Sequence, residues 1–121
     1  MKLSALGYWS SPEVPNLPDP ARLVDADWDE SERILVSDYL ARGQVARQFM
    51  GVSRCRLCGS ANGSAEMTDG TFIWPEGLGH YVIQHSVRLP RDFIGHIFAR
   101  LAELDEASVD RSWWMARAFD V

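Results

Sequence analysis

The chain has 121 residues and a net charge of −5, and 46% of its residues are hydrophobic. This length suits one domain, and this hydrophobic share is typical of globular rather than disordered proteins. The acidic balance argues against a general nucleic-acid binder. No apolar run approaches the roughly 18 residues of a membrane span, and the first 15 residues do not resemble a secretory signal. We therefore expect a cytoplasmic protein without a structural disulfide.

The charges are unevenly distributed along the chain. Residues 1–38 carry three basic and eight acidic groups, whereas residues 39–64 carry four arginines and no acid. The arginines are Arg42, Arg47, Arg54 and Arg56. The simplest interpretation is a solvated face whose arginines pair with nearby carboxylates. A surface that contacts a partner is the alternative.

Residues 1–28 are expected to form an extended, proline-rich arm, because proline fixes φ and removes backbone donors. Tyr8 and Trp9 are the expected anchors of this arm. A helix over about 29–42 follows, with Asp29 or Ser31 as its N-cap. The alternating pattern of "QVARQFM" then predicts a short strand within 44–50.

The next segment predicts a β-hairpin followed by a helix. Strands are expected at about 64–68 and 71–74, with Asp69-Gly70 forming a type I′ turn between them. Pro75 suits the first turn of a helix over about 75–86. Two glycines weaken this helix, so packing or a ligand must hold it.

The C-terminal residues predict two further helical segments. An apolar stripe indicates a helix over about 90–104. The last segment, about 107–118, is followed by Phe119 and is rich in large apolar side chains: Trp113, Trp114 and Met115. We expect it to pack on the core, and a partner-binding helix is the alternative.

These elements predict an α+β fold. It is a small single domain over 1–121, with a zinc-finger-like cysteine knuckle, a β-hairpin and a helix, packed with about three further helices. Its expected parts are the arm at 1–28, a helix and strand at 29–50, a zinc-binding core at 51–88 and the C-terminal helices at 89–121.

Cys55, Cys58, His80 and His85 have spacings that zinc sites commonly show. The cysteines form Cys-x₂-Cys and the histidines form His-x₄-His, with 21 residues between the pairs. That interval exceeds the usual zinc-finger loop, but the order of knuckle, hairpin and helix is the expected one. Two thiolates and two imidazoles would make a closed, structural Zn²⁺ site.

The spacing of the two histidines raises a geometric difficulty. Histidines five residues apart on an ideal helix differ by about 140° around its axis, since each residue advances roughly 100°. Both can reach one metal only if the helix tightens, widens or ends between them. His96, on the next predicted helix, is the reserve ligand.

Other interpretations of the four residues stay open. Cys55 and Cys58 could form a redox pair, although the βαβ pattern of thioredoxin-like proteins is missing. They could also be core thiols, or bind metal without the histidines. A catalytic zinc would need an open coordination position and a base, for which Glu66, Asp69 and Glu76 are the available carboxylates.

The run "CRLCGSANGSAEMTDGTFIWPEGLGHYVIQHSVRLPRDF", from Cys55 to Phe93, resembles a family of small, mostly bacterial uncharacterised proteins. The shared pattern is CxxCG, NG, TDG, WPEGLxHY and VRLP, and it covers about a third of the chain. The lead-in residues "LGYW" and "GVSRC" also look similar. The resemblance implies that the cysteines and histidines form one site, and it implies no activity.

The sequence therefore predicts a non-catalytic, zinc-stabilised protein-interaction module, such as an immunity or adaptor protein. Its partner would be another protein. The candidate contacts are Arg54, Arg56, Trp74, Glu76 and Tyr81. The first alternative is a small zinc-dependent enzyme with a carboxylate base. A nucleic-acid-binding zinc-finger-like protein, with Trp74 or Tyr81 as a stacking platform, is the second.

Overall fold

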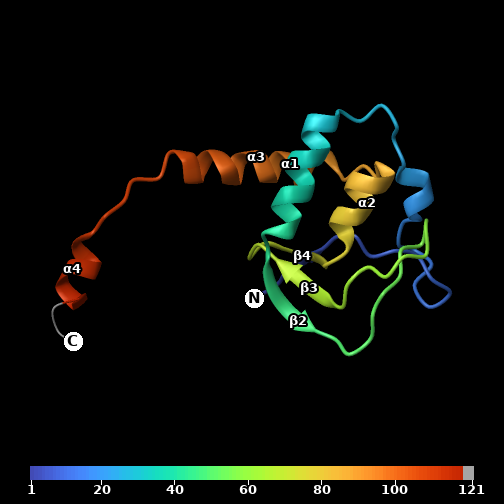
Figure 1. The fold of residues 1–121 in the computed structure, drawn as a ribbon, viewed down its shortest axis with the longest axis horizontal. Helices are drawn as coiled ribbons and strands as arrows, with labels where there is room; N and C mark the ends of the chain where they lie inside the picture. Colours follow the sequence, from blue (N-terminus) through green and yellow to red (C-terminus); the bar gives the residue numbers. More distant parts are fainter. Residues whose placement is uncertain (119–121) are drawn as a thin grey trace.

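A four-stranded sheet in the order β1-β4-β3-β2 forms the base of the fold (Figure 1). The computed structural model describes residues 1–118. The strands are β1 (Ser4–Ala5), β2 (Gln44–Gln48), β3 (Ala65–Thr68) and β4 (Phe72–Pro75). β2, β3 and β4 pair antiparallel, and β1 adds in parallel to β4. The three strands expected from the sequence are confirmed, whereas β1 lies within the expected extended arm.

Four α-helices and one 3₁₀ turn complete the fold. They are η1 (Pro20–Leu23), α1 (Glu30–Ala41), α2 (Leu78–His85), α3 (Arg91–Asp105) and α4 (Ser112–Ala118). Asp29 caps α1, since its carboxylate accepts a hydrogen bond from the Glu32 amide at 2.9 Å. The helices predicted near 29–42 and 90–104 are confirmed, and so is the α+β class.

The core lies between the sheet and helices α1, α2 and the first half of α3. Its buried members include Val36, Leu40, Met67, Trp74, Leu78, Val82, Phe93 and Ile97. Trp74 is fully buried at its centre, and its indole N–H donates to the Leu40 carbonyl at 3.3 Å. Trp74 therefore links β4 to the C-terminal end of α1 within the core.

The helix expected over 75–86 begins later than predicted. Pro75 still belongs to β4, where it is the register partner of Glu66. The Glu76 amide donates to the Ala65 carbonyl at 2.8 Å, so pairing with β3 keeps this segment out of the helix. The prediction was wrong for the first three residues, because the strand pairing outweighs the preference of Pro75 for a helix start.

The hairpin forms, but its turn is not the predicted type I′. That turn needs positive φ at both central residues, whereas Gly70 has φ 92° and Asp69 does not have positive φ. The Asp69 carboxylate accepts hydrogen bonds from the Thr71 and Phe72 amides at 2.9 and 2.8 Å. Asp69 therefore organises the turn through its side chain rather than by a left-handed backbone.

The segment expected to pack on the core over 107–118 does not do so. Trp113, Trp114 and Met115 in α4 are 61%, 64% and 59% exposed. α4 lies at the end of an arm that leads away from the sheet (Figure 1). Apolar composition alone does not specify which surface covers a helix, so the prediction of core packing was wrong. Phe119 lies outside the described residues.

The N-terminal arm is anchored by the two aromatic residues expected from the sequence. The Trp9 ring packs edge-on against Tyr81 of α2, with 5.2 Å between the ring centroids. The Tyr8 hydroxyl donates a hydrogen bond to the Glu66 carboxylate of β3. The arm thereby joins the helix that carries the histidines to the sheet.

Candidate metal centre

A tight turn places the two cysteine thiols. The Cys55 carbonyl accepts a hydrogen bond from the Gly59 amide at 2.8 Å, and the Cys55 amide donates to the Ser60 carbonyl at 2.9 Å. Gly59 has φ 74°, a conformation that glycine adopts without steric cost. The Leu57 amide lies 3.4 Å from the Cys55 sulfur and donates to it. The sequence thus forms a knuckle in which a backbone amide donates a hydrogen bond to the Cys55 sulfur.

The two histidines lie near opposite ends of α2, and the last turn of that helix is widened. The Ser86 amide donates to the Tyr81 carbonyl five residues earlier, one residue further than in an ideal α-helix. Ser86 then adopts a left-handed conformation and ends the helix. The rings of His80 and His85 come within 5.1 Å, centroid to centroid. Because α2 widens in its last turn and then ends, His80 and His85 can face the same point although they are five residues apart.

The knuckle and α2 bring the four predicted ligands together. One ligand atom from each of Cys55, Cys58, His80 and His85 lies within 4.8 Å of every other. The Cys58 sulfur is 3.4 Å from His80 Nε2. Ligand atoms of a tetrahedral zinc lie roughly 3.3 to 3.8 Å apart, given metal–ligand distances of about 2.0 to 2.3 Å. The cluster needs only a small contraction to reach that size.

One nitrogen in this cluster fits a metal particularly well. His85 Nε2 is buried and has no hydrogen-bond partner among the described residues. An unpaired buried polar atom costs free energy unless something satisfies it. A metal ion bound to the neighbouring thiolates would satisfy this nitrogen. The residues therefore fit a metal centre of two cysteines and two histidines.

The surroundings of Cys58 favour the thiolate. Hydrogen bonds from the Ser60 hydroxyl and amide, followed by the neighbouring imidazoles of His85 and His80, lower the pKa of the Cys58 thiol to about 5. Arg54 and Arg56 flank Cys55 in sequence but are not among these causes. Their guanidinium groups donate to backbone carbonyls, of Gly59 at 3.2 Å and of Ser10 at 2.8 Å.

Among the candidate partner contacts, Trp74 and Tyr81 are buried. Trp74 belongs to the core, and Tyr81 is 5% exposed, with its hydroxyl accepting a hydrogen bond from the Arg56 amide at 2.8 Å. This placement corrects the expectation that Trp74 meets a partner, whereas the small exposed part of Tyr81 lines the pocket described next. Glu76 is exposed, but its Oε1 accepts from the Ser64 and Ala65 amides. Arg54 and Arg56 are the exposed candidates on the knuckle.

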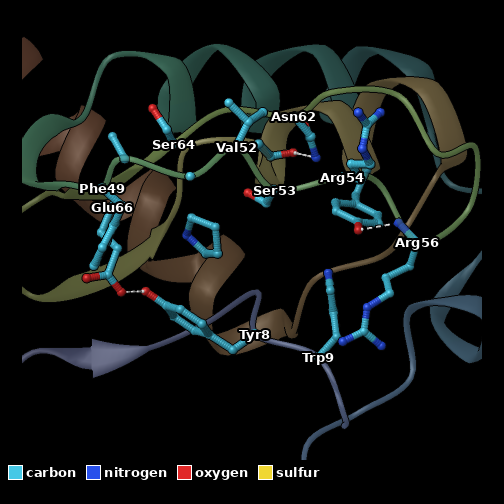
Figure 2. A pocket seen from close by; sticks show the side chains of 15 residues that line it. Tyr8, Trp9, Phe49, Val52, Ser53, Arg54, Arg56, Asn62, Ser64 and Glu66 are labelled. Atoms are coloured by element: carbon cyan, nitrogen blue, oxygen red, sulfur yellow. Dashed lines mark hydrogen bonds between the residues drawn. The ribbon is translucent and has the colours of Figure 1, made fainter.

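A pocket of about 490 Å³ lies beside the knuckle (Figure 2). Its apolar lining includes Trp9, Phe49, Val52 and Pro75. Tyr8 and Glu66 meet at one end, and Arg54 and Arg56 lie at the other. Tyr81, which sits between the metal-site histidines on α2, also lines it. The pocket therefore borders the knuckle and the helix that carry the four potential ligands.

The reserve ligand His96 belongs to a different site, which the sequence did not reveal. Its Nε2 lies 2.7 Å from Asp69 Oδ2, and the Tyr39 hydroxyl donates to the same oxygen at 2.6 Å. Burial alone would raise the pKa of Asp69. Hydrogen bonds, chiefly from the Phe72 amide and the Tyr39 hydroxyl, outweigh burial and lower it to about 2. This cluster ties the hairpin turn to α1 and α3.

Asp69 gives a prediction about pH. Its folded-state pKa of about 2 lies below the ordinary 3.8, so its stabilisation is complete above pH 3.8 and is lost as the pH falls toward 2. We expect Asp69→Asn to lower the free energy of unfolding by about 2 kcal/mol at neutral pH. The difference in unfolding free energy between the variant and the unmodified protein should shrink as the pH falls from 3.8 toward 2. Urea unfolding at several pH values measures this difference, and a difference that does not change with pH would contradict the prediction.

No helix of residues 1–118 is long and apolar enough to cross a membrane.

Comparisons of the chain with protein-family models, with curated proteins and with solved structures find no match.

Proposed function

We propose that the protein is a non-catalytic, zinc-stabilised protein-interaction module. The observation that carries the proposal is the four-ligand cluster, in which two thiols and two imidazoles lie within 4.8 Å of one another. Thiolate and imidazole together suit Zn²⁺ in a tetrahedral site. Such an ion would join the knuckle to α2 and stabilise both. Because thiolate ligands must stay reduced, the proposal places the protein in the cytoplasm.

The positions of the carboxylates favour a structural rather than a catalytic zinc. A catalytic site needs an open position and a nearby base. Glu66 is bound by the Tyr8 hydroxyl, and Asp69 is held by Tyr39 and His96. Glu76 accepts two backbone amides. Each of these three carboxylates is thus engaged by other groups of the fold, and none is among the four clustered potential ligands. This arrangement favours the structural role over the enzyme alternative.

The pocket next to the metal centre is the surface that we assign to a protein partner. Arg54 and Arg56 flank Cys55 in sequence and line this pocket, where apolar side chains form much of the wall. Interfaces commonly combine an apolar centre with arginine. Binding by an immunity or adaptor protein would use such a surface. The nucleic-acid alternative loses support, because both of its stacking candidates, Trp74 and Tyr81, are buried.

The coordination of the metal tests this function. We expect purified protein to contain one zinc per chain, and X-ray absorption should show two sulfur and two nitrogen ligands without a bound water. Three protein ligands with a water would instead favour the enzyme alternative. A protein that is fully folded without metal would contradict the role of zinc.

A further inference from the structure

The C-terminal arm exposes large apolar side chains that its own domain does not cover. The first half of α3 is anchored by Phe93, Ile94 and Ile97, which are buried. Its second half extends past the sheet and leads to α4 (Figure 1). α4 presents Trp113, Trp114 and Met115, each more than half exposed. Such a concentration of large apolar side chains on an exposed surface marks an interaction site.

The same arm also carries a surface suited to receive these side chains. Phe98, Leu101 and Leu104 follow one another at a spacing of three residues on α3 and are 47%, 38% and 66% exposed. Leu101 borders a cavity of about 320 Å³ whose lining includes Ile34 and Leu35 of α1. We call Phe98, Leu101 and Leu104 the α3 stripe. These three side chains together line a hollow on the surface of α3, and Leu101 connects it to the cavity beside α1.

The charges of the two surfaces are complementary. Every charged residue between 102 and 106 is acidic: Glu103, Asp105 and Glu106. The charged residues between 110 and 117 are Asp110, Arg111 and Arg117, of which Arg117 lies within α4. The Arg117 guanidinium lies 4.4 Å from the centroid of the Trp113 ring. α4 therefore presents an aromatic surface with a guanidinium beside it, and the end of α3 presents an acidic, apolar surface.

We propose that α4 of one chain docks on the α3 stripe of a second copy, and that the exchange is reciprocal. Each chain then supplies one anchor and one groove, which is the arrangement that a closed two-fold dimer requires. The two tryptophans and the methionine of both arms, with the surfaces that receive them, would bury roughly 1,200 Å² or more. That area reaches the range of stable protein interfaces. The assignment does not depend on the metal.

Sedimentation of the full-length protein at several concentrations tests the dimer. We expect a species of twice the 13.6 kDa chain mass at high concentration, and a monomer on dilution. The double variants Trp113→Ala/Trp114→Ala and Leu101→Glu/Leu104→Glu should each be monomeric, with at least tenfold weaker association. Zinc content and far-ultraviolet circular dichroism should be unchanged in both, which separates this result from the role of the metal.

Mixing the two double variants tests whether α4 of one chain binds the α3 stripe of another. The first variant keeps an intact stripe and the second keeps an intact α4, so we expect the mixture to form a one-to-one complex that neither forms alone. A mixture that stays monomeric would overturn the pairing and favour contact between two α4 helices. An unmodified chain that is monomeric up to millimolar concentration would overturn the dimer. Buried tryptophan fluorescence in that monomer would indicate that α4 folds back on its own α3.

Discussion

Replacing Cys55 with serine should abolish zinc binding and lower the free energy of unfolding by about 4 kcal/mol or more, the scale that loss of a structural metal reaches. Cys55 is 3% exposed and contributes one of the four donors. A serine hydroxyl stays protonated near neutral pH and is a poor zinc ligand. Metal analysis and urea unfolding with and without a chelator measure the effect. The chelator should destabilise the unmodified protein and leave the variant unchanged.

Two of the three histidines provide a matched pair of variants for this experiment. His85 supplies a donor to the cluster, whereas His96 lies against Asp69 on another part of the fold. His85→Ala should therefore lose zinc. His96→Ala should keep one zinc per chain, even though losing the contact with Asp69 lowers its stability. Equal zinc retention by the two variants would show that the four-residue cluster is not the metal site.

The second large effect is expected at Trp74, whose replacement by alanine should cost about 3 to 5 kcal/mol of stability. Its ring is fully buried and packs near Tyr39 and Phe93, with centroid separations of 6.4 and 6.3 Å. Truncation removes these contacts, leaves a cavity and frees the Leu40 carbonyl from its indole partner. Chemical unfolding measures the change.

Phe49→Ala is the control for Trp74→Ala. Phe49 is also aromatic but is 54% exposed, so its replacement should change stability by no more than about 0.5 kcal/mol. Comparable losses for the two variants would mean that Trp74 is not the centre of the core. Because the Trp74 side chain is buried, a protein partner should bind the folded Trp74→Ala variant as tightly as the unmodified protein.

The clustering of Cys55, Cys58, His80 and His85 could be predicted from the sequence, because coordination chemistry restricts both the residue types and their spacing. Cys55 and Cys58 had to share a turn, and the histidines had to follow on a helix. The widening of that helix at Ser86 was not visible in the sequence. It depends on a hydrogen bond to Tyr81, whose position is set by Trp9 and by the knuckle.

The Asp69 cluster and the exposure of α4 could not be predicted, for a different reason. Tyr39, Asp69 and His96 lie on three elements that meet only through packing, and the Asp-Gly signal accounted for Asp69 as a turn residue. The hydrophobicity of Trp113 and Trp114 indicates that burying their rings is favourable. It does not indicate whether the surface that buries them belongs to the same chain.

The pairing of β1 with β4 has a consequence for how the chain folds. Ser4 and its register partner Phe72 lie far apart in the sequence, so their pairing closes a long loop. The knuckle and α2, by contrast, need only the chain between Cys55 and His85. Closing the longer loop costs more entropy, and non-local pairing slows folding. We therefore expect the four potential ligands to come together before β1 joins β4 during refolding of the whole chain.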